Sequence, residues 1–277
     1  MPRISVLFPA HRVNPFMADA LRSIAAQSFK DFEVLFLDNS VEGIDSSHWN
    51  FDDRIRHIKL SSSFGLAETL NAGIAISDAE FLARMDYDDL SHPERFAKQI
   101  QFLETNQDIS ILGTGAKVIG MDIDDHAKYG NSLRRPQNPS EIIGYLLEKN
   151  PLIHPTVMFR NNFFQISSIR YRRSYDGAED LDFWTRASHV VGIANLDEDL
   201  LEYRIHPGQF SREDSLNSVQ LALRCRIRHA AWVIIHIPEL RLRAIKALGR
   251  GVIKLIRHYP GTVTAQRFSK FRESKFD

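Results

Sequence analysis

Residues 1–100 alternate short apolar runs with stretches of helical periodicity. The apolar runs, all typical of strands, are Ile4–Phe8, Phe32–Leu37, Ile55–Leu60 and Phe81–Met85. Two segments with apolar side chains at helical spacing, 16–27 and 66–77, separate them. Because strands that alternate with helices tend to pair in parallel, this order predicts an α/β domain with a mainly parallel sheet flanked by helices.

A dense acidic cluster, Asp86-Tyr87-Asp88-Asp89, directly follows the last of these strands. Its three carboxylates repel one another unless water or a cation screens them. Asp86 and Asp88 are spaced so that a turn can aim both at one hard cation, with phosphate oxygens completing the coordination. Taken alone, such a pattern is more often a solvated acidic turn. The strand before it and the motifs around it favour a metal site.

Two other predicted strands also end in polar residues, Pro9-Ala10-His11 and Asp38-Asn39-Ser40. Ligands of parallel sheets bind outside the carboxyl ends of the strands, so these ends predict one binding rim. Asp38 can accept a hydrogen bond from a ring N–H or a ribose hydroxyl, or it can cap the turn that follows. The absence of G-x-G-x-x-G after the first strand argues against a dinucleotide site, and the absence of G-x-x-x-x-G-K-[ST] excludes a P-loop.

Beyond the acidic cluster, the sequence predicts a helix and two strands. Ser91 is expected to be the N-cap of a helix that reaches Glu104, with Glu94 completing a capping box. The strand-like runs are Ile109–Gly113 and Ala116–Gly120. The polar stretch from Met121 to Pro139 is expected to be a loop.

A second acidic concentration begins at Asp176 and includes Glu179 and Asp180. Helical spacing places Asp180 near Phe183 and Trp184, and Glu179 at the adjacent position on the helix surface. A carboxylate beside aromatic rings in a cleft can act as a general base toward a hydroxyl. The alternative is a helix N-terminus whose carboxylates interact with the helix dipole.

Two basic side chains, Arg204 and His206, follow the apolar run near residue 200. They could offset the charge of a diphosphate, although isolated residues of this kind more often belong to ordinary loops. Neither H-E-x-x-H nor a histidine pair suited to zinc occurs.

The composition is that of an ordinary globular protein, with 277 residues, 43% hydrophobic and 25% charged. The single cysteine, Cys225, excludes an intramolecular disulfide and a cysteine-based metal site, and it fits a reducing compartment. The N-terminus lacks the pattern of a signal peptide, and no apolar stretch has the ~18–20 residues of a membrane span. We therefore expect a cytoplasmic protein.

The net charge of zero conceals an asymmetry between the body and the C-terminal tail. From Ala222 onward there are 13 cations, against the three acids Glu239, Glu273 and Asp277. This contrast predicts a domain over residues 1–221 and a basic, amphipathic helical extension over residues 222–277. The extension could lie on an anionic membrane surface. Alternatively, it could pack as a helical cap on the domain or on a second copy of the chain.

The ordered set of motifs resembles the family 2 glycosyltransferases, inverting enzymes with the GT-A fold. The resemblance covers about residues 3–211, and its motifs are specific as an ordered set rather than singly. The segments that carry it are Ile4–Pro9, Leu37–Ser40, Gly65–Gly73, Met85–Asp89, His154-Pro155, Glu179–Trp184 and Tyr203–His206.

The resemblance implies a role for each matching residue. Pro9, Asp38 and Asp86 would contact the nucleoside, and Asp86 and Asp88 would hold Mn²⁺ or Mg²⁺. Asp180 would be the catalytic base. The remaining expected site residues are Arg204 and His206 at the donor and Glu179 and Trp184 at the acceptor.

The resemblance also implies an activity: metal-dependent transfer of a sugar from a nucleotide-sugar, with a UDP-sugar favoured, to an acceptor hydroxyl. The acceptor would be a saccharide or a lipid-linked saccharide of cell-envelope polysaccharide or glycolipid synthesis, at the inner face of the cell membrane. Two departures matter. Pro-x-Tyr-Asn-x-Glu is replaced by Pro9-Ala10-His11-Arg12-Val13-Asn14, so contacts there are open. Gln-x-x-Arg-Trp is missing after Trp184, which favours adding one sugar over polymerising.

Two other functions remain as alternatives. A non-catalytic nucleotide- or sugar-binding module could share the same rim, although Asp180 favours catalysis. A nucleotidyltransferase is disfavoured because no glycine-rich basic loop follows the first strand. We expect no nucleic-acid partner, and we keep a homodimer as an open expectation.

Overall fold

The computed structural model describes residues 1–45, 51–120, 130–206 and 216–258. The strands are β1 (Ile4–Ala10), β2 (Phe32–Asp38), β3 (Ile55–Lys59), β4 (Phe81–Arg84), β5 (Leu90–Ser91), β6 (Ile109–Gly120), β7 (Ser132–Leu133), β8 (Met158–Arg160) and β9 (Gly192–Ile205). The α-helices are α1 (Met17–Ala25), α2 (Leu66–Ile76), α3 (Arg95–Thr105), α4 (Pro139–Leu146), α5 (Asn161–Ile166), α6 (Glu179–Ala187), α7 (Leu216–His236) and α8 (Arg241–His258). Short 3-10 turns are η3 (His154–Thr156), η4 (Arg173–Tyr175) and η6 (Pro238–Leu240).

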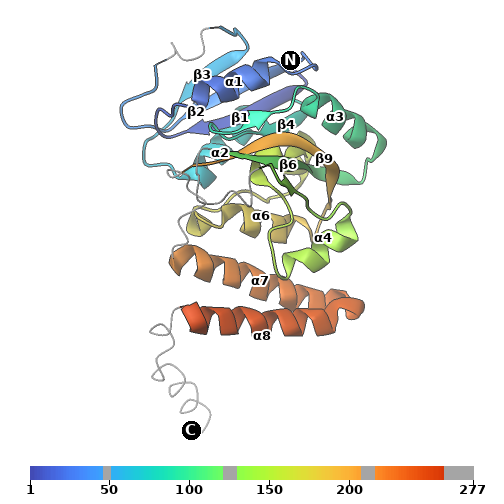
Figure 1. The fold of residues 1–277 in the computed structure, drawn as a ribbon. Coiled ribbons are helices and arrows are strands. Elements are labelled where there is room, and N and C mark those ends of the chain that lie inside the picture. The colour runs from blue at the N-terminus through green and yellow to red at the C-terminus, as the bar shows by residue number, and fades with distance from the viewer. Residues whose placement is uncertain (46–50, 121–129, 207–215, 259–277) are drawn as a thin grey trace.

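These strands form one mixed sheet (Figure 1). Its order is β3-β2-β1-β4-β8-β6-β9-β5, and β7 pairs with β6. The strands β3, β2, β1 and β4 are parallel, as their alternation with helices predicts. The short strand β8 reverses this direction, because it pairs antiparallel with both β4 and β6. The expected parallel arrangement therefore describes the N-terminal half, and the second half adds antiparallel pairs.

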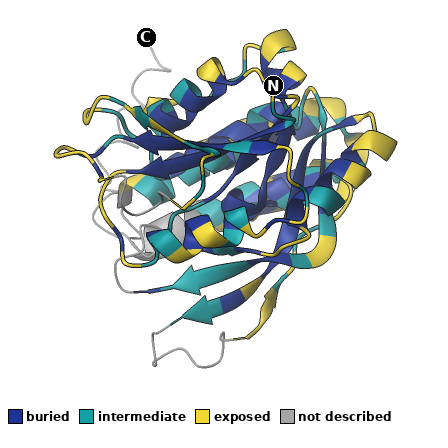
Figure 2. Cartoon of the chain, turned by 90° about the horizontal axis from the view of Figure 1, so that it is seen from above, coloured by how far each residue is buried: buried dark blue, intermediate teal, exposed yellow. Residues whose placement is uncertain are grey.

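Helices cover both faces of the sheet, so its strands are largely buried (Figures 1 and 2). On one face, α1 and α3 contribute Leu21 and Phe96 to a core that includes Val6 and Ala83. On the other face, α2, α4 and α6 pack over the alternate side chains of the same strands. Consecutive side chains of a strand point to opposite faces, so Arg84 at the end of β4 lies on the α6 side.

The small residues of α2 let this helix approach the sheet closely, as the sequence suggests. A Cβ atom on Gly73 would lie 2.7 Å from Leu37 and 2.8 Å from Leu7. Such distances are shorter than real Cβ contacts, so glycine is required at this helix–sheet contact.

The predicted capping box at Ser91 and Glu94 is wrong. Ser91 belongs to β5, and its hydroxyl accepts a hydrogen bond from the amide of Gln27 at 3.1 Å. Helix α3 starts only at Arg95, with Glu94 at the N-cap and no side-chain cap. A tertiary partner 64 residues away therefore replaces the local cap. The two strands predicted around residue 114 are likewise one continuous strand, β6.

The C-terminal helices form two further layers beneath α6 (Figure 1). Helix α7 packs against α6, and its Leu221 and Cys225 are buried. Helix α8 packs against α7 through a separate small cluster that includes Ala230, Val233 and Ala244. The predicted domain boundary after residue 221 lies inside α7. In the part of the chain that is described, every helix is too short or too polar to cross a lipid bilayer.

Candidate functional site

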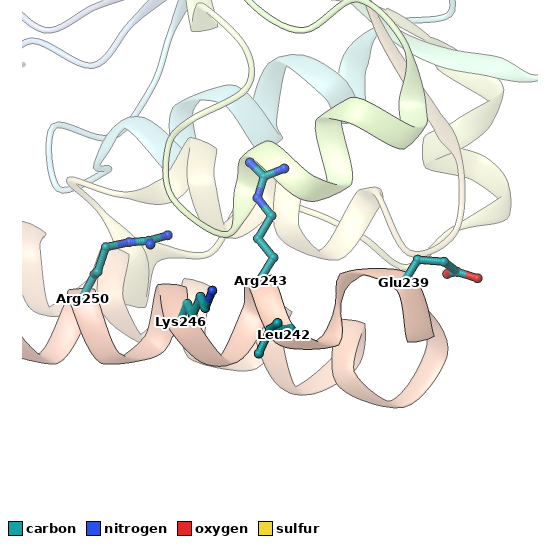
Figure 3. Close-up of a pocket in the computed structure, with 5 residues that line it drawn as sticks. All are labelled: Glu239, Leu242, Arg243, Lys246 and Arg250. Atoms are coloured by element: carbon teal, nitrogen blue, oxygen red, sulfur yellow. The ribbon is translucent and has the colours of Figure 1, made fainter.

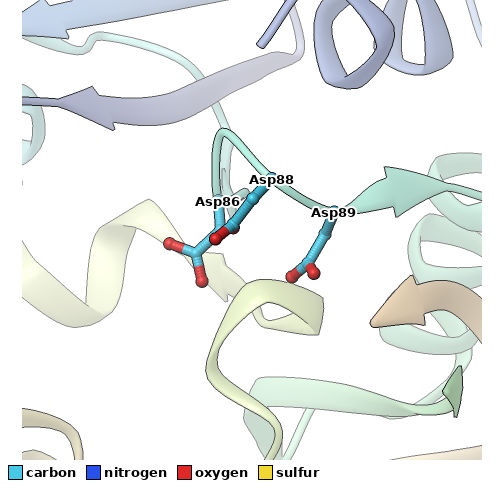
Figure 4. A group of neighbouring side chains, drawn as sticks. All are labelled: Asp86, Asp88 and Asp89. Carbon is cyan, nitrogen blue, oxygen red and sulfur yellow. The ribbon is translucent and has the colours of Figure 1, made fainter. Parts of the chain in front are cut away.

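The acidic turn lies at the carboxyl end of β4, where the sequence predicts it (Figure 4). The backbone N–H of Met85 donates to the carbonyl of Leu7 at 3.1 Å, which fixes the strand end against β1. One carboxylate oxygen from each of Asp86, Asp88 and Asp89 lies within 4.8 Å of the other two. This spacing gathers three hard oxygen ligands around one point.

Asp89 supports a cation site at this turn. Its side chain is buried, and its Oδ1 accepts a hydrogen bond from the backbone N–H of Arg204 at 2.8 Å. Its Oδ2 is also buried but has no hydrogen-bond partner among the described residues. Burial, and then the charges of Asp86 and Asp88, raise the pKa of Asp89 well above its usual value. An orphaned oxygen in such a cluster fits a divalent cation, because the cation would supply the missing partner.

The end of β9 closes the acidic turn from the other side. Strand β5 pairs antiparallel with β9, which brings Arg204 and His206 beside the aspartates. The Nε2 atom of His206 lies 2.9 Å from Oδ2 of Asp88, and Nε of Arg204 donates to the Asp88 carbonyl at 2.8 Å. Both residues therefore contact the aspartate cluster itself.

Arg84 is a site residue that the sequence analysis missed. Its guanidinium is buried and donates through Nη1 to Asp86. The Nη2 atom of Arg95 donates to the carbonyl of Arg84 at 2.6 Å and so holds the strand end from the opposite face. Burial raises the pKa of Asp86 to about 6, although the positive charge of Arg84 favours the ionised form. The sequence did contain a signal for Arg84, because a single arginine interrupts an otherwise apolar strand pattern.

Asp180 lies in the first turn of α6. Its Oδ1 accepts from the backbone N–H of Leu181 at 2.6 Å, and the amide of Asn150 donates to its Oδ2. Burial raises the pKa of Asp180, while these hydrogen bonds favour its ionised form. The charge of Asp180 in turn contributes to the raised pKa of Asp86. The two acidic motifs, far apart in sequence, therefore interact across one site.

Glu179 lies beside Asp180 and is buried. Its Oε2 accepts a hydrogen bond from the backbone N–H of Gly177 at 2.7 Å. Gly177 has φ +93°, a conformation that favours glycine in the turn before α6. Burial, and then the charge of Asp180, raise the pKa of Glu179 to about 7.

The segment before α6 is tied to α2, which fixes where the helix begins. Asn71 and the backbone of Tyr171 exchange two hydrogen bonds, of 2.8 and 3.0 Å. Asp176 accepts from the backbone N–H of Ala67 in the first turn of α2 at 3.3 Å. A Cβ atom on Gly65 would lie 2.0 Å from this carboxylate, so only glycine permits the contact.

Asp38 lies at the end of β2 and is fully buried. The backbone N–H groups of Ser40 and Ile44 donate to its two carboxylate oxygens at 2.8 and 3.0 Å. Nε2 of His57 and Nζ of Lys59 lie 3.0 and 3.3 Å away. Burial alone would raise the pKa of Asp38, but hydrogen bonds from the Ser40 hydroxyl, the two backbone N–H groups and His57 lower it to about 2. Its carboxylate thus organises the turn after β2, and a nucleoside contact stays a prediction.

Pro9 is buried within β1, which extends to Ala10 instead of ending before the proline. The backbone carbonyl of Leu7 points to β4 and that of Ala10 points to β2. Because backbone groups alternate along a strand, the backbone nitrogen of Pro9 points to the β4 side. Strand β4 pairs with β1 only as far as Leu7. The missing N–H of Pro9 therefore removes no hydrogen bond from the sheet.

Trp184 and Asp182 are packed inside the protein. Trp184 is fully buried, with its ring centroid 5.9 Å from that of Phe159, and its contact with an acceptor stays a prediction. Asp182 is also fully buried, and it accepts hydrogen bonds from Arg186 of α6 and Arg228 of α7. Of the acidic residues in this turn, Glu179 and Asp180 remain as site candidates.

Comparisons with known proteins agree with this arrangement. The profile described as "Glycosyl transferase family 2" matches residues 5–167. The chain is 30% identical to the O-antigen biosynthesis glycosyltransferase WbnJ of Escherichia coli, over 73% of this chain and 80% of WbnJ. It is 29% identical to the putative glycosyltransferase EpsE of Bacillus subtilis, over 80% of each chain.

Solved structures share the fold at low sequence identity. TarS of S. aureus, solved in complex with UDP, superposes with a TM-score of 0.65 at 17% identity, over 97% of this chain and 78% of TarS. The mannosyltransferase PcManGT of Pyrobaculum calidifontis, solved with GDP-Man and Mn²⁺, gives 0.58 at 13% identity, over 99% and 79%. The predicted GT-A fold is confirmed, and the chain belongs to glycosyl transferase family 2, a family of glycosyltransferase enzymes.

Proposed function

We propose that this chain transfers a single sugar, with inversion, from a UDP-sugar to an acceptor hydroxyl. The observation that carries the proposal is the cluster of three carboxylates in the turn after β4. Asp180 in the first turn of α6, held by Asn150, is a second and separate carboxylate. An inverting transfer needs a cation near the leaving diphosphate and a base on the opposite face of the sugar. Separate carboxylates for these two tasks are present here.

Asp86 and Asp88 are the proposed ligands of Mn²⁺ or Mg²⁺, and Asp89 and His206 complete their surroundings. A bound divalent cation supplies Lewis-acid stabilisation of the charge that develops on a diphosphate. Arg204 and His206 form the donor end of the site, and Pro9, Asp38 and Asp86 its nucleoside end. In this arrangement Asp38 acts by holding the turn after β2.

Asp180 is the proposed general base, which takes the proton of the acceptor hydroxyl. Asn150 holds its carboxylate in place, and burial makes it more basic than an exposed aspartate. Glu179 is the proposed acceptor contact because it lies beside Asp180 in the first turn of α6. The proton moves from the acceptor oxygen to a carboxylate oxygen of Asp180. As the acceptor oxygen bonds to the anomeric carbon, the bond from that carbon to the diphosphate breaks and UDP leaves.

The donor and the biological setting are proposed from the comparisons. TarS was solved with UDP and with UDP-GlcNAc, which favours a UDP-sugar over the GDP-Man bound to PcManGT. WbnJ and the amylovoran biosynthesis glycosyltransferase AmsE of Erwinia amylovora point to envelope polysaccharide synthesis. We therefore propose a saccharide or lipid-linked acceptor at the inner face of the cell membrane.

The decisive experiment measures UDP release from a panel of UDP-sugars with Mn²⁺, with and without an envelope extract as acceptor source. The extract should stimulate release by the wild-type chain. Asp180→Asn should lower transfer by about 10²–10⁴-fold, because it removes the general base, and leave donor affinity within a few-fold.

The alternatives predict different results in the same assay. A binding module would bind UDP with the wild-type chain but release none from any donor. A nucleotidyltransferase would release pyrophosphate from a nucleoside triphosphate and a sugar phosphate. A variant Asp180→Asn that keeps most of its transfer rate would move the base to another residue.

A further inference from the structure

Helix α8 is the outermost described layer of the molecule (Figure 1). Small residues on its inner face pack on α7. Ala244 and Ala247 are buried against α7. A Cβ atom on Gly251 would lie 2.9 Å from Leu223, so the two helices approach closely. The packing of α8 on the body of the protein therefore uses these small residues together with the partly buried Leu248.

Two large apolar side chains of α8 lie on the opposite side. Leu242 is 64% exposed and Ile245 is 56% exposed. The two residues are three positions apart, so they are neighbours on the helix surface. A Cβ atom on Gly249 would have no neighbour within 4 Å, so the same side is open further along the helix. A helix that only packed on its own domain would turn its largest apolar residues inward.

Cations surround this apolar pair. From Arg241 to Gly251 there are four cations and no acid. Among the described residues, Lys246 has no carboxylate within ion-pair distance, whereas Arg243 and Arg250 lie 3.5 and 3.0 Å from Glu148. A shallow depression on this helix, lined by Glu239, Leu242, Arg243, Lys246 and Arg250, joins the apolar and cationic side chains (Figure 3).

We propose that the outer face of α8 docks on an anionic lipid bilayer. Leu242 and Ile245 would enter the headgroup region, and Lys246 would lie near lipid phosphates. Exposed apolar residues combined with cations on one helix are typical of interfacial helices. A protein partner of comparable fit would have to present carboxylates around an apolar pocket, whereas an anionic bilayer offers both features over a continuous surface.

Two packed layers connect this face to the candidate active site. Helix α8 packs on α7, and Arg228 of α7 donates to Asp182 of α6, two residues from Asp180. Docking through α8 would therefore hold the site at a set height and orientation above the bilayer. This inference names the surface behind the proposed membrane location and does not depend on the transfer reaction.

Vesicle flotation of the full-length protein tests the inference. Wild type should bind vesicles of phosphatidylcholine with phosphatidylglycerol at low salt and detach at high salt. Lys246→Gln should weaken binding about fivefold, and Leu242→Ser with Ile245→Ser at least tenfold. Ile76→Ser, at an exposed position of α2, is the matched control and should bind like wild type.

Thermal unfolding and UDP binding of each variant, measured in parallel, show whether the variant is folded. Wild-type protein that stays unbound at low salt overturns the inference, as does a folded double variant that binds like wild type. A dimer that the double serine variant dissociates, without any vesicle binding by wild type, would also overturn it and assign the face to a second copy. Because flotation needs no sugar transfer, failure of the proposed enzyme activity leaves this test intact.

Discussion

At the scale of single residues, two aspartates of α6 have different environments. Asp180 is half-buried and held by the neutral amide of Asn150, whereas Asp182 is fully buried between Arg186 and Arg228. The oxygens of Asp182 are therefore occupied by hydrogen bonds that join α6 to α7. Sequence spacing does not separate the two residues, because Arg228 is 46 positions from Asp182. Tertiary pairing thus decides which carboxylate is available for chemistry.

Asp88→Asn tests the metal site directly. The substitution keeps the shape of the side chain but removes one of three clustered carboxylates, so Mn²⁺-dependent affinity for UDP should fall at least tenfold. Calorimetric titration of UDP with and without Mn²⁺ measures the effect, and Asp31→Asn, at an exposed acid before β2, is the control. Equal Mn²⁺ dependence in the Asp88 variant and wild type would remove the metal role of Asp88.

The raised pKa of Glu179 predicts a pH dependence of stability. A carboxyl group whose pKa rises to about 7 on folding binds its proton more tightly in the folded state. Its contribution to stability is complete below pH 4.5 and is lost as the pH rises toward 7. Glu179→Gln, which is neutral throughout, should therefore be more stable relative to wild type at pH 7.5 than at pH 5. Urea unfolding of the metal-free protein measures this difference, and a pH-independent difference would contradict it.

At the scale of elements, the sequence predicts the helices and strands that have a periodic apolar pattern of their own. β1, β2, β4, α1 and α2 lie close to the expected positions because each has an apolar pattern of sufficient length. The two-residue strands β5 and β7 were not predicted, because so short a strand is specified by its partner rather than by its own residues. Ser91 shows the same effect, since Gln27 determines its role.

The residues of the candidate site divide in the same way, into those whose positions the sequence predicts and those whose positions depend on distant partners. The positions of Asp38 and Asp86 could be predicted because the carboxyl ends of parallel strands share one edge of the sheet. Arg84, Asn150 and the proximity of His206 to Asp88 could not, because their contacts depend on side-chain directions and on pairing of distant strands. The buried position of Trp184 likewise depends on aromatic neighbours from β8.

The ion pair between α7 and α6 provides a prediction at this scale. Arg228→Met should destabilise the fold by about 1–2 kcal/mol, because buried Asp182 loses one of its two close partners while Arg186 remains. The value is at the low end for a buried pair because the Arg228 side chain is 41% exposed and partly screened by solvent. Arg224→Met, one turn away and exposed, is the control and should change stability little. Thermal or urea unfolding measures the stability of both variants. Equal stability of the two variants would show that the pair of Arg228 and Asp182 does not stabilise the fold.

At the scale of the whole molecule, the layers follow one another from the sheet through α6 and α7 to α8 (Figure 1). The first of the two C-terminal helices is part of the main core, because Cys225 of α7 packs with residues of the α6 face. The second belongs to a smaller cluster with Leu147 of the domain. A change in charge composition near residue 220 therefore does not mark the end of the packed domain.

Truncation separates the roles of these two layers. A chain that ends at Ile237 should still unfold cooperatively, at a lower temperature, because it loses only the small cluster around Val233 and Ala244. A chain that ends at Val219 also loses the buried side chains of Leu221 and Cys225 and the partner Arg228 of Asp182. This shorter chain should be insoluble or lack a cooperative transition, because it exposes the core behind α6 and leaves a buried carboxylate with fewer partners. Yield, thermal unfolding and UDP binding of the two chains measure the difference. A chain ending at Val219 that folds and binds UDP like the full-length protein would show that α7 is an appendage and not a layer of the core.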